Sequence, residues 1–298
     1  MKTGATTPKP PIRTAVIAAG GFGTRFLPFT KIVPKELLPI GDTPTIELLV
    51  KECINAGIEK IYIIVRTDSD LLKRHFSQNV QYEKYLKEYG KNQYLKKITL
   101  DSYKSCKMYF VKENENLPYG NARGLFTIQK ILKKENSFLI LFADDIVIGK
   151  KSSIKELIEK YIHSDCEAMV GVQTTPRINI PNYGNVKLKK RTKDIIESII
   201  QKPNQKQIVS NLVVYSQLVV TPEIFKYLKL NQKGKELDIA IALNKLAQNK
   251  KVLAYKTNGT WVTIGDPVNY LKANLAGAIF QKLINPKNLI DYIKTLKF

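Results

Sequence analysis

The chain opens with a buried strand, a glycine-rich loop, a helix and a second buried strand. Residues 14–20 (TAVIAAG) form a continuous apolar run that ends in glycine, as in a strand covered on both faces. Residues 43–57 carry apolar side chains at helical spacing and stop at Gly57. Residues 60–65 (KIYIIV) form the next apolar run. This order predicts a βαβ unit and therefore an α/β fold with a largely parallel sheet covered by helices.

The rest of the chain continues the alternation of strands and helices. Residues 151–162 (KSSIKELIEKYI) predict an amphipathic helix with serine at its start. Residues 71–103, rich in Lys and Tyr, predict a helical insertion between two strands. Short β-rich segments follow Thr175. Further strands are predicted at 107–111, 138–143 and 167–174, and further helices at 234–249 and 267–283.

No internal repeat and no linker divides the sequence, so we expect one domain over residues 14–298. The polar, proline-rich residues 1–13 are expected to form a disordered lead-in. Within the domain, residues 14–150 and 151–298 are expected to form two halves of one fold.

The charge of the chain is strongly positive, with 48 Lys and Arg against 26 Asp and Glu and a net charge of +22. Such a charge fits a polyanion partner, but the basic residues are mostly Lys and are spread along the whole chain. No zinc-finger, RRM or KH pattern occurs. We therefore expect no specific nucleic-acid partner, with binding to RNA as the open alternative, and a positive field that gathers phosphorylated substrates.

Several other classes lack a signal in the sequence. No window approaches the roughly 20 continuous apolar residues of a membrane span, and residues 1–13 lack the apolar core of a secretory signal. We therefore expect no membrane partner and a cytoplasmic location. The three cysteines, Cys53, Cys106 and Cys166, form neither a disulfide framework nor a zinc pattern.

The loop after the first predicted strand carries the strongest functional signal. Such a loop lies at the carboxyl edge of the sheet, where ligands of open α/β folds bind. Its glycines can turn backbone N–H groups toward an anion, while its cationic side chains suit phosphate. The residues are Gly20, Gly21, Gly23, Arg25 and Lys35. The loop lacks the ending of a Walker A motif and the glycine fingerprint of dinucleotide-binding enzymes, so its phosphate site is of another kind.

Two adjacent acids, Asp144 and Asp145, directly follow the predicted strand at 138–143. Carboxylates at a strand's carboxyl end suit a hard cation with oxygen ligands. A turn or a helix cap is the alternative interpretation of this pair.

Residues 18–44 (AAGGFGTRFLPFTKIVPKELLPIGDTP) resemble the signature G-x-G-T-R-x-x-P-x-T-x-x-x-P-K-E of sugar-nucleotide pyrophosphorylases, and more narrowly of the bacterial UTP–glucose-1-phosphate uridylyltransferases. The helical insertion is also typical of the uridylyltransferases. Further matches follow in order at 52–65, 143–148 (ADDIVI), 183–186 (YGNV), 201–203 (QKP), 234–243 (GKELDIAIAL) and 261–275.

The resemblance implies a fold and a reaction. The fold is a Rossmann-like, three-layer α/β/α arrangement with a mixed, mostly parallel central sheet and a small β-rich half. Residues 14–150 would bind the nucleotide, and residues 151–298 the sugar phosphate. The reaction is the Mg²⁺-dependent formation of UDP-glucose and pyrophosphate from UTP and glucose 1-phosphate, in a protein that forms dimers or tetramers.

The resemblance also assigns roles to single residues. Arg25 would hold the departing β- and γ-phosphates, Lys35 the phosphates near the α-phosphorus, and Lys202 the phosphate of the attacking sugar. Asp144 would bind Mg²⁺. The remaining nucleotide contacts are Gly20, Gly21, Gly23, Thr24, Glu36, Glu113 and Gly120, and the sugar contacts are Gly184, Gln201 and Asn211.

Four positions depart from the family pattern. Glu113 stands where a Gln is usual, Gln201 where a Glu is usual, and Thr263 where an Asp is usual. The loop before Gly120 is reshaped and brings in Arg123. These departures leave three alternatives open: use of dTTP or another NTP, use of another sugar phosphate, and a catalytically silent nucleotide-binding homologue.

Overall fold

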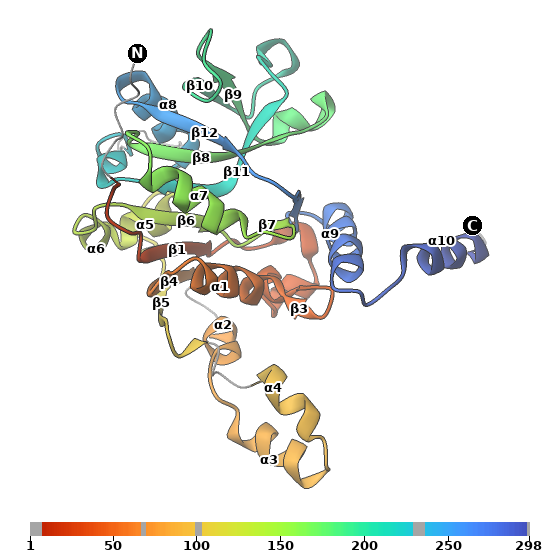
Figure 1. Ribbon diagram of the computed structural model, residues 1–298. Helices are drawn as coiled ribbons and strands as arrows, with labels where there is room; N and C mark the ends of the chain where they lie inside the picture. Colours follow the sequence, from red (N-terminus) through yellow and green to blue (C-terminus); the bar gives the residue numbers. More distant parts are fainter. Residues whose placement is uncertain (1–7, 67–69, 99–102, 229–235, 297–298) are drawn as a thin grey trace.

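The computed structural model describes residues 8–66, 70–98, 103–228 and 236–296. At its centre lies a nine-stranded sheet, in which β5, β4, β1 and β6 run parallel in that order (Figure 1). Strand β11 joins β6 in the antiparallel direction, and its N-terminal part pairs with β9, which pairs with β10. The other edge of β11 carries β8, and β12 runs parallel to β8.

The strands of this sheet are β1 (Thr14–Ala19), β4 (Lys60–Val65), β5 (Lys107–Lys112), β6 (Phe138–Phe142), β8 (Ala168–Thr174), β9 (Gly184–Leu188), β10 (Ile196–Gln201), β11 (Leu212–Val220) and β12 (Val252–Lys256). Two small sheets pair β2 (Pro39–Ile40) with β3 (Thr43–Pro44), and β7 (Asp145–Ile148) with β13 (Thr260–Thr263).

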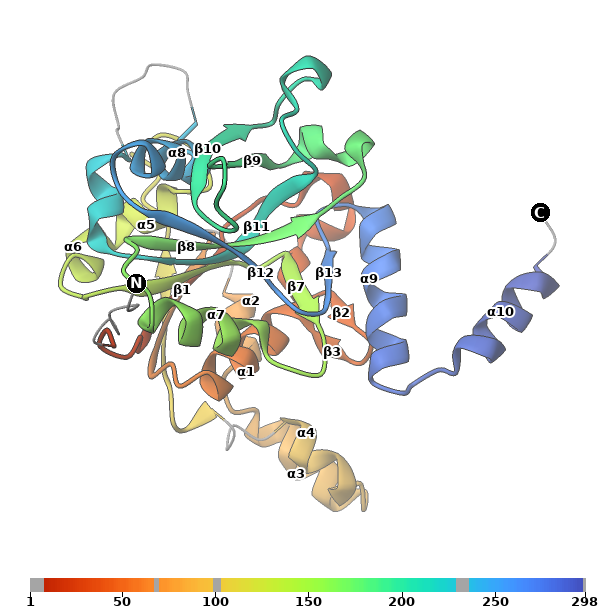
Figure 2. The ribbon, with the colours of Figure 1, turned by 45° about the horizontal axis from the view of Figure 1, so that its top comes forward.

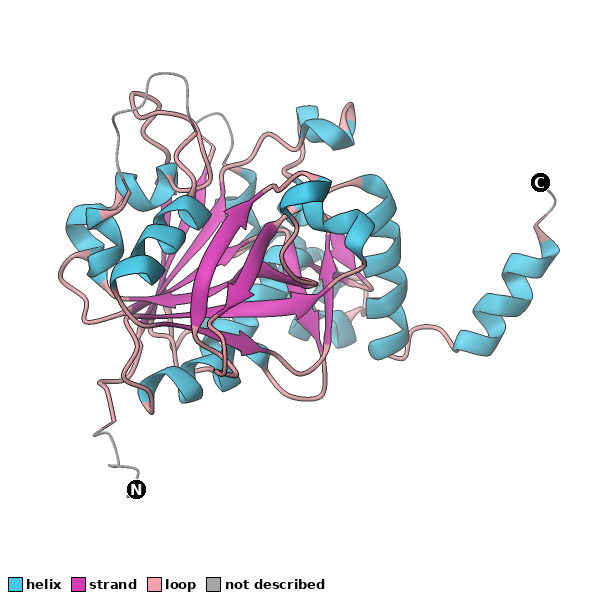
Figure 3. Ribbon diagram, turned by 90° about the horizontal axis from the view of Figure 1, so that it is seen from above, coloured by secondary structure: helices cyan, strands magenta, loops and turns pink. Residues whose placement is uncertain are grey.

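Helices cover both faces of the sheet (Figure 3). Consecutive residues of β1 point to opposite faces: Ile17 packs in one buried cluster with residues of α1 and α7, and Val16 packs in another with residues of α5, α6 and α8. The helices are α1 (Thr45–Asn55), α2 (Leu71–His75), α3 (Val80–Glu88), α4 (Leu95–Ile98), α5 (Arg123–Thr127), α6 (Gln129–Leu132), α7 (Ser153–Ile162), α8 (Ile239–Asn249), α9 (Pro267–Phe280) and α10 (Pro286–Thr295).

These layers confirm the predicted α/β/α fold with its mixed sheet. The βαβ opening and the predicted strands and helices are present, and the N-cap of α7 is Ser152, whose side chain accepts from the N–H of Lys155. Two ends differ. Helix α8 begins only at Ile239, because the carboxylate of Asp238 caps it by accepting from Ala240; residues 234–235 of the predicted helix lie outside the described residues. Helix α9 ends at Phe280, and α10 was not predicted.

The lead-in expected to be disordered is ordered over residues 8–13. Ile12 is 2% exposed in the core beneath α1 and α7. The N–H of Lys9 donates to the carbonyl of Ile162, and its ammonium lies 3.9 Å from the ring centroid of Tyr161. Burying one isoleucine side chain contributes roughly 2 kcal/mol, and the contacts of Lys9 add to this in ordering the segment. The rest of the predicted lead-in, residues 1–7, lies outside the described residues.

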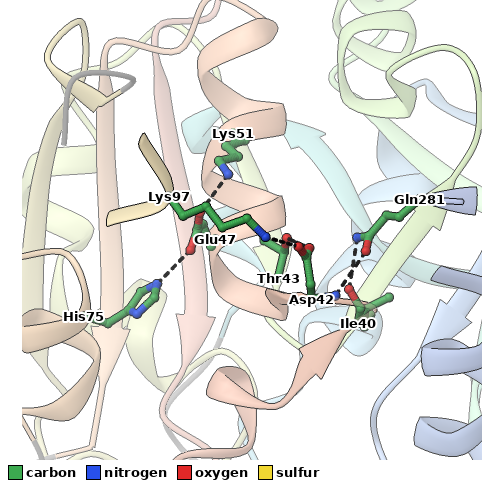
Figure 4. Close-up of polar contacts among 8 residues, drawn as sticks. All are labelled: Ile40, Asp42, Thr43, Glu47, Lys51, His75, Lys97 and Gln281. Atoms are coloured by element: carbon green, nitrogen blue, oxygen red, sulfur yellow. Dashed lines mark hydrogen bonds and ion pairs between the residues drawn. The ribbon is translucent and has the colours of Figure 1, made fainter. Parts of the chain in front are cut away.

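The predicted insertion between β4 and β5 is helical where it is described, and α3 and α4 project from the body of the protein (Figure 1). Figure 4 shows how its ends are held. His75 of α2 lies 3.0 Å from the carboxylate of Glu47 in α1, which also pairs with Lys51 at 2.7 Å. Lys97 of α4 pairs with Asp42 in the β2–β3 turn at 2.7 Å. Gln281, just after α9, contacts the same turn.

The last helix, α10, lies apart from the rest of the molecule (Figures 1 and 2). None of its residues is buried, and Ile290, Tyr292 and Ile293 are exposed. Among the described residues, no helix combines the length and the apolar character needed to cross a membrane.

Candidate active site

A cavity of about 380 Å³ opens between the glycine loop after β1 and the ends of β5, β6 and β10. Much of its wall consists of residues that the sequence predicts to act together, although they come from distant parts of the chain. These lining residues are Gly20, Gly21, Lys35, Glu36, Glu113, Gly120, Asp144, Gln201 and Lys202.

The glycine loop has its shape for local reasons. Gly23 has a φ of 63°, in the left-handed region that glycine adopts without strain. The hydroxyl of Thr30 donates to its carbonyl at 2.8 Å and holds the turn. At Gly20 a Cβ atom would lie 2.8 Å from the Cδ of Glu113, so a larger residue there would displace the Glu113 side chain. The loop therefore brings bare backbone to the cavity.

Lys35 and Asp144 form a direct ion pair in the wall of this cavity, with Nζ 2.6 Å from Oδ2. Burial lowers the pKa of Lys35, but the negative charge of Asp144 outweighs it and the pKa is raised. Burial conversely raises the pKa of Asp144, and Lys35 reverses that effect, so the pKa of Asp144 is lowered. Both groups are thus held in their charged forms, ready to contact phosphate and a cation.

Glu36, next to Lys35, is 1% exposed, and its Oε2 atom finds no hydrogen-bond partner among the described residues. Burial raises the pKa of Glu36 to about 7, although Lys35 opposes the rise.

A second cavity, of about 130 Å³, adjoins the first. The two share four wall residues: Asn121, Phe142, Asn182 and Gln201. The second is also lined by Gly184 and Asp145. The amide of Gln201 donates to Asp238 at 2.7 Å, which fixes its orientation. Two cavities with a common wall can hold two ligands in contact.

Lys202 directly follows β10 and Gln201, and it lines the larger cavity. Its N–H donates to the carbonyl of Tyr183 at 3.0 Å, and its φ of 45° lies in the left-handed region. For a residue with a side chain that conformation carries strain, and such strain gathers at functional sites. Lys202 therefore lines the cavity in a backbone conformation that is unfavourable for lysine.

Asp145 is the residue that the sequence analysis left without a role. It lies in antiparallel register with Thr263, and both Thr263 and Ser216 (at 2.6 Å) donate a hydrogen bond to its carboxylate. Burial and the charge of Asp144 raise the pKa of Asp145 to about 6. The Thr263 hydroxyl thus donates a hydrogen bond to the Asp145 carboxylate, whereas a second carboxylate at position 263 would repel it.

The other predicted site residues lie around the cavities. The guanidinium of Arg25 donates a hydrogen bond to the carbonyl of Gly265 at 3.2 Å. Its charge helps lower the pKa of Asp144. Thr24 begins the short turn that carries Arg25. Asn211 is exposed just before β11 and is not among the residues that line either cavity. Asn121 and Asn182, which line both, carried no signal in the sequence.

The acidic residues suit a cation held jointly with substrate. Within the described ranges, no group of three or more His, Cys, Asp or Glu side chains forms a closed metal site. Mg²⁺ does not require one, since it keeps several waters and is commonly bound by one or two carboxylates together with substrate phosphates. Asp144, ionised and facing the larger cavity, fits that role.

Phosphate-handling α/β enzymes are the class that this fold and these cavities define. The chain belongs to the nucleotidyl transferase family, whose sequence profile matches residues 14–278. It is 32% identical over 290 residues to UTP–glucose-1-phosphate uridylyltransferase 2 of Staphylococcus saprophyticus, covering 96% of this chain and 98% of the relative. It is also 32% identical over 291 residues to the uridylyltransferase of Staphylococcus haemolyticus, covering 96% and 99%.

Solved structures give the same picture. A UDP-glucose pyrophosphorylase in complex with UDP-glucose superposes with a TM-score of 0.78 at 27% identity, over 91% of this chain and 99% of that one. The UTP-bound enzyme from Acinetobacter baumannii superposes with a TM-score of 0.82 at 26% identity, over 96% and 100%.

Proposed function

We propose that this protein transfers a uridylyl group, forming UDP-glucose and pyrophosphate from UTP and glucose 1-phosphate. The observation that carries the proposal is the pair of adjoining cavities. The larger has the glycine loop, the Lys35–Asp144 pair and Lys202, and the smaller has a mostly apolar wall that also includes Asp145 and Gln201. The relatives named for this activity span nearly the whole chain and support the same substrates.

The chemistry needs positioning more than covalent work by the protein. A phosphate oxygen of glucose 1-phosphate attacks the α-phosphorus of UTP, and pyrophosphate leaves as the bond to the β-phosphate breaks. Lys202 binds the attacking phosphate, Lys35 neutralises charge near the α-phosphorus, and Arg25 holds the departing pyrophosphate.

Asp144 supplies the carboxylate for a divalent cation. Members of this family use such an ion, and we propose Mg²⁺, which when bound would neutralise charge on the crowded phosphates. Lys35, at 2.6 Å from Asp144, keeps that carboxylate ionised before the ion arrives.

Release of pyrophosphate by the purified protein tests the proposal. UTP, glucose 1-phosphate and Mg²⁺ together should give turnover, and Asp144→Asn should lower kcat by about 100-fold or more. Glu197→Gln, at an exposed residue paired with Lys187, is the matched control and should leave the rate unchanged. A panel of NTPs and sugar phosphates separates the alternatives. Turnover with another pair of substrates would redefine the substrates, and no pyrophosphate release with any pair would contradict the proposed enzymatic activity.

We also propose that the protein forms a homo-oligomer through its C-terminal helices. The last two helices of the chain leave apolar side chains exposed. Val268 and Leu271 are exposed on α9, and Ile290 and Ile293 are exposed on α10. A second copy of the chain presents the same pair of apolar surfaces, so each can cover the other.

A further inference from the structure

A third cavity, of about 360 Å³, lies outside the candidate active site. Its wall comes from the β2–β3 turn, α1 and the helical insertion, and its volume is close to that of the larger active-site cavity. No residue of this wall has a role in the transfer step described above. Most of the wall consists of ionisable side chains: Asp42, Glu47, Lys51, His75, Lys96 and Lys97.

Glu47 has partners for both of its carboxylate oxygens within this wall (Figure 4). Its Oε1 atom accepts from the ammonium of Lys51 at 2.7 Å, and its Oε2 atom lies 3.0 Å from Nε2 of His75. The carboxylate therefore ties α1 to α2 and positions two basic side chains at the cavity.

Asp42 is satisfied in the same way by the turn and by α4. Its Oδ1 atom accepts from the hydroxyl of Thr43 at 2.8 Å, and its Oδ2 atom accepts from the ammonium of Lys97 at 2.7 Å. The hydrogen bond from Lys97 lowers the pKa of Asp42, so this carboxylate stays ionised. All four carboxylate oxygens of the wall are thus engaged by the wall itself.

The lysines of the wall keep donors that the acids do not use. An ammonium group carries three N–H donors and no acceptor, so Lys51 and Lys97 each retain two after pairing with a carboxylate. The ammonium of Lys96 forms no hydrogen bond or ion pair within the ranges that the structure describes. With His75 neutral, three ammonium groups face two carboxylates, which leaves positive charge in excess. The cavity therefore suits a ligand that is an anion and a hydrogen-bond acceptor.

The size and the remaining wall of the cavity indicate the class of anion. Its volume falls within the range of small-molecule sites, roughly 300–1,000 Å³. Tyr103, which is 8% exposed, and Pro44 add apolar surface to the wall. An organic group can lie against that surface while three terminal phosphate oxygens accept from the three ammonium groups.

We propose that this cavity binds a small phosphorylated metabolite, a phosphate monoester whose phosphate is held by Lys51, Lys96 and Lys97. Lys51 belongs to α1, whereas Lys96 and Lys97 belong to α4 of the insertion. A bound ligand therefore links the insertion to the body of the protein and stabilises the folded chain.

Isothermal titration calorimetry tests this inference, with glucose 6-phosphate as the monoester, inorganic phosphate as the bare anion and glucose as the compound without phosphate. An ionic strength of about 0.15 M screens weak attraction to the general positive charge of the chain. Glucose 6-phosphate should bind at a saturable site and raise the thermal midpoint of unfolding. Inorganic phosphate should bind more weakly, and glucose should not bind.

Three variants locate the site. Lys96→Gln should weaken this binding at least about 10-fold, because a charge-assisted hydrogen bond is lost. Lys87→Gln makes the same change at an exposed position of α3 outside the cavity and should keep the wild-type affinity. Lys202→Ala removes a cation from the active site and should also keep it.

Four results would overturn the inference: no saturable binding to the wild type, unchanged affinity in Lys96→Gln, loss of binding in Lys202→Ala, or equal binding of inorganic phosphate and the monoester. The third would place the probe in the active site, and the fourth would contradict the assignment to a monoester. The titrations involve no turnover, so a protein without the proposed transferase activity would leave the inference standing.

Discussion

Lys202 combines a proposed substrate contact with an unfavourable backbone, and these two properties can be separated by mutation. Its φ of 45° suits glycine, which has no Cβ to collide with the backbone. We expect Lys202→Ala and Lys202→Gly to weaken the use of sugar phosphate far more than the binding of NTP. We expect Lys202→Gly also to be more stable than Lys202→Ala by about 1 kcal/mol.

Steady-state kinetics with each substrate varied, together with urea unfolding, measure both effects. Equal losses toward the two substrates would mean that Lys202 does not serve the sugar phosphate. Equal stability of the two variants would mean that the left-handed backbone carries no strain.

The sequence reveals single site residues where their signal is local. Gly20, Gly21, Arg25 and Lys35 fall in one stretch, and their arrangement follows from the chemistry of glycine and of charged groups. Asn121 and Asn182 belong to the common wall of the cavities only because separate elements meet there. The donors to Asp145, Ser216 and Thr263, likewise come from distant strands. Nothing near these residues in the chain indicates their role.

The helical insertion depends on Glu47, which links α1 to α2. The Glu47 side chain is 12% exposed; burial raises its pKa, but hydrogen bonds from His75, Lys51 and Tyr103 outweigh burial and lower it to about 2 from an ordinary value of 4.5. Because the pKa is lower in the folded state, ionised Glu47 stabilises the fold above pH 4.5. That contribution is lost as the pH falls toward 2.

Glu47→Gln should therefore lower the free energy of unfolding at pH 7 by about 2–3 kcal/mol. The difference between wild type and variant should shrink steadily below pH 4.5. Urea unfolding from pH 7 to pH 3 measures it, with the exposed Glu88→Gln of α3 as control. A difference that does not change with pH would assign the effect to packing and not to charge.

Secondary structure could be predicted best where the pattern is long and buried. The strands at the centre of the sheet are continuous apolar runs, so each appears where expected. The ends of elements depend on single contacts that the sequence does not reveal, such as the cap that Asp238 forms at α8. Residues 8–13 were expected to be disordered from their composition, but Ile12 reaches the core and orders them.

The separate position of α10 bears on the assembly of the whole protein. Deleting residues 284–298 removes this helix and keeps Gln281, which contacts the β2–β3 turn. Because α10 contributes no buried side chain to its own fold, the thermal midpoint of the isolated chain should hardly change. The apolar surface that a second copy covers is lost, so the molar mass should fall to that of one chain.

Light scattering coupled to gel filtration, over a range of protein concentrations, gives this mass. Replacing the exposed Lys287 and Lys294 of α10 by Gln is the control, since it leaves the apolar side chains in place. A truncated protein with the mass of the full chain would show that α10 does not join the copies.

The common wall of the two cavities affects what happens after the bond has formed. Asn121, Phe142, Asn182 and Gln201 border both spaces, so the sugar nucleotide made there occupies the two together. Neither starting compound can return until that larger molecule has departed. Under the proposed function, we therefore expect the finished sugar nucleotide to compete with both starting compounds and to slow its own production.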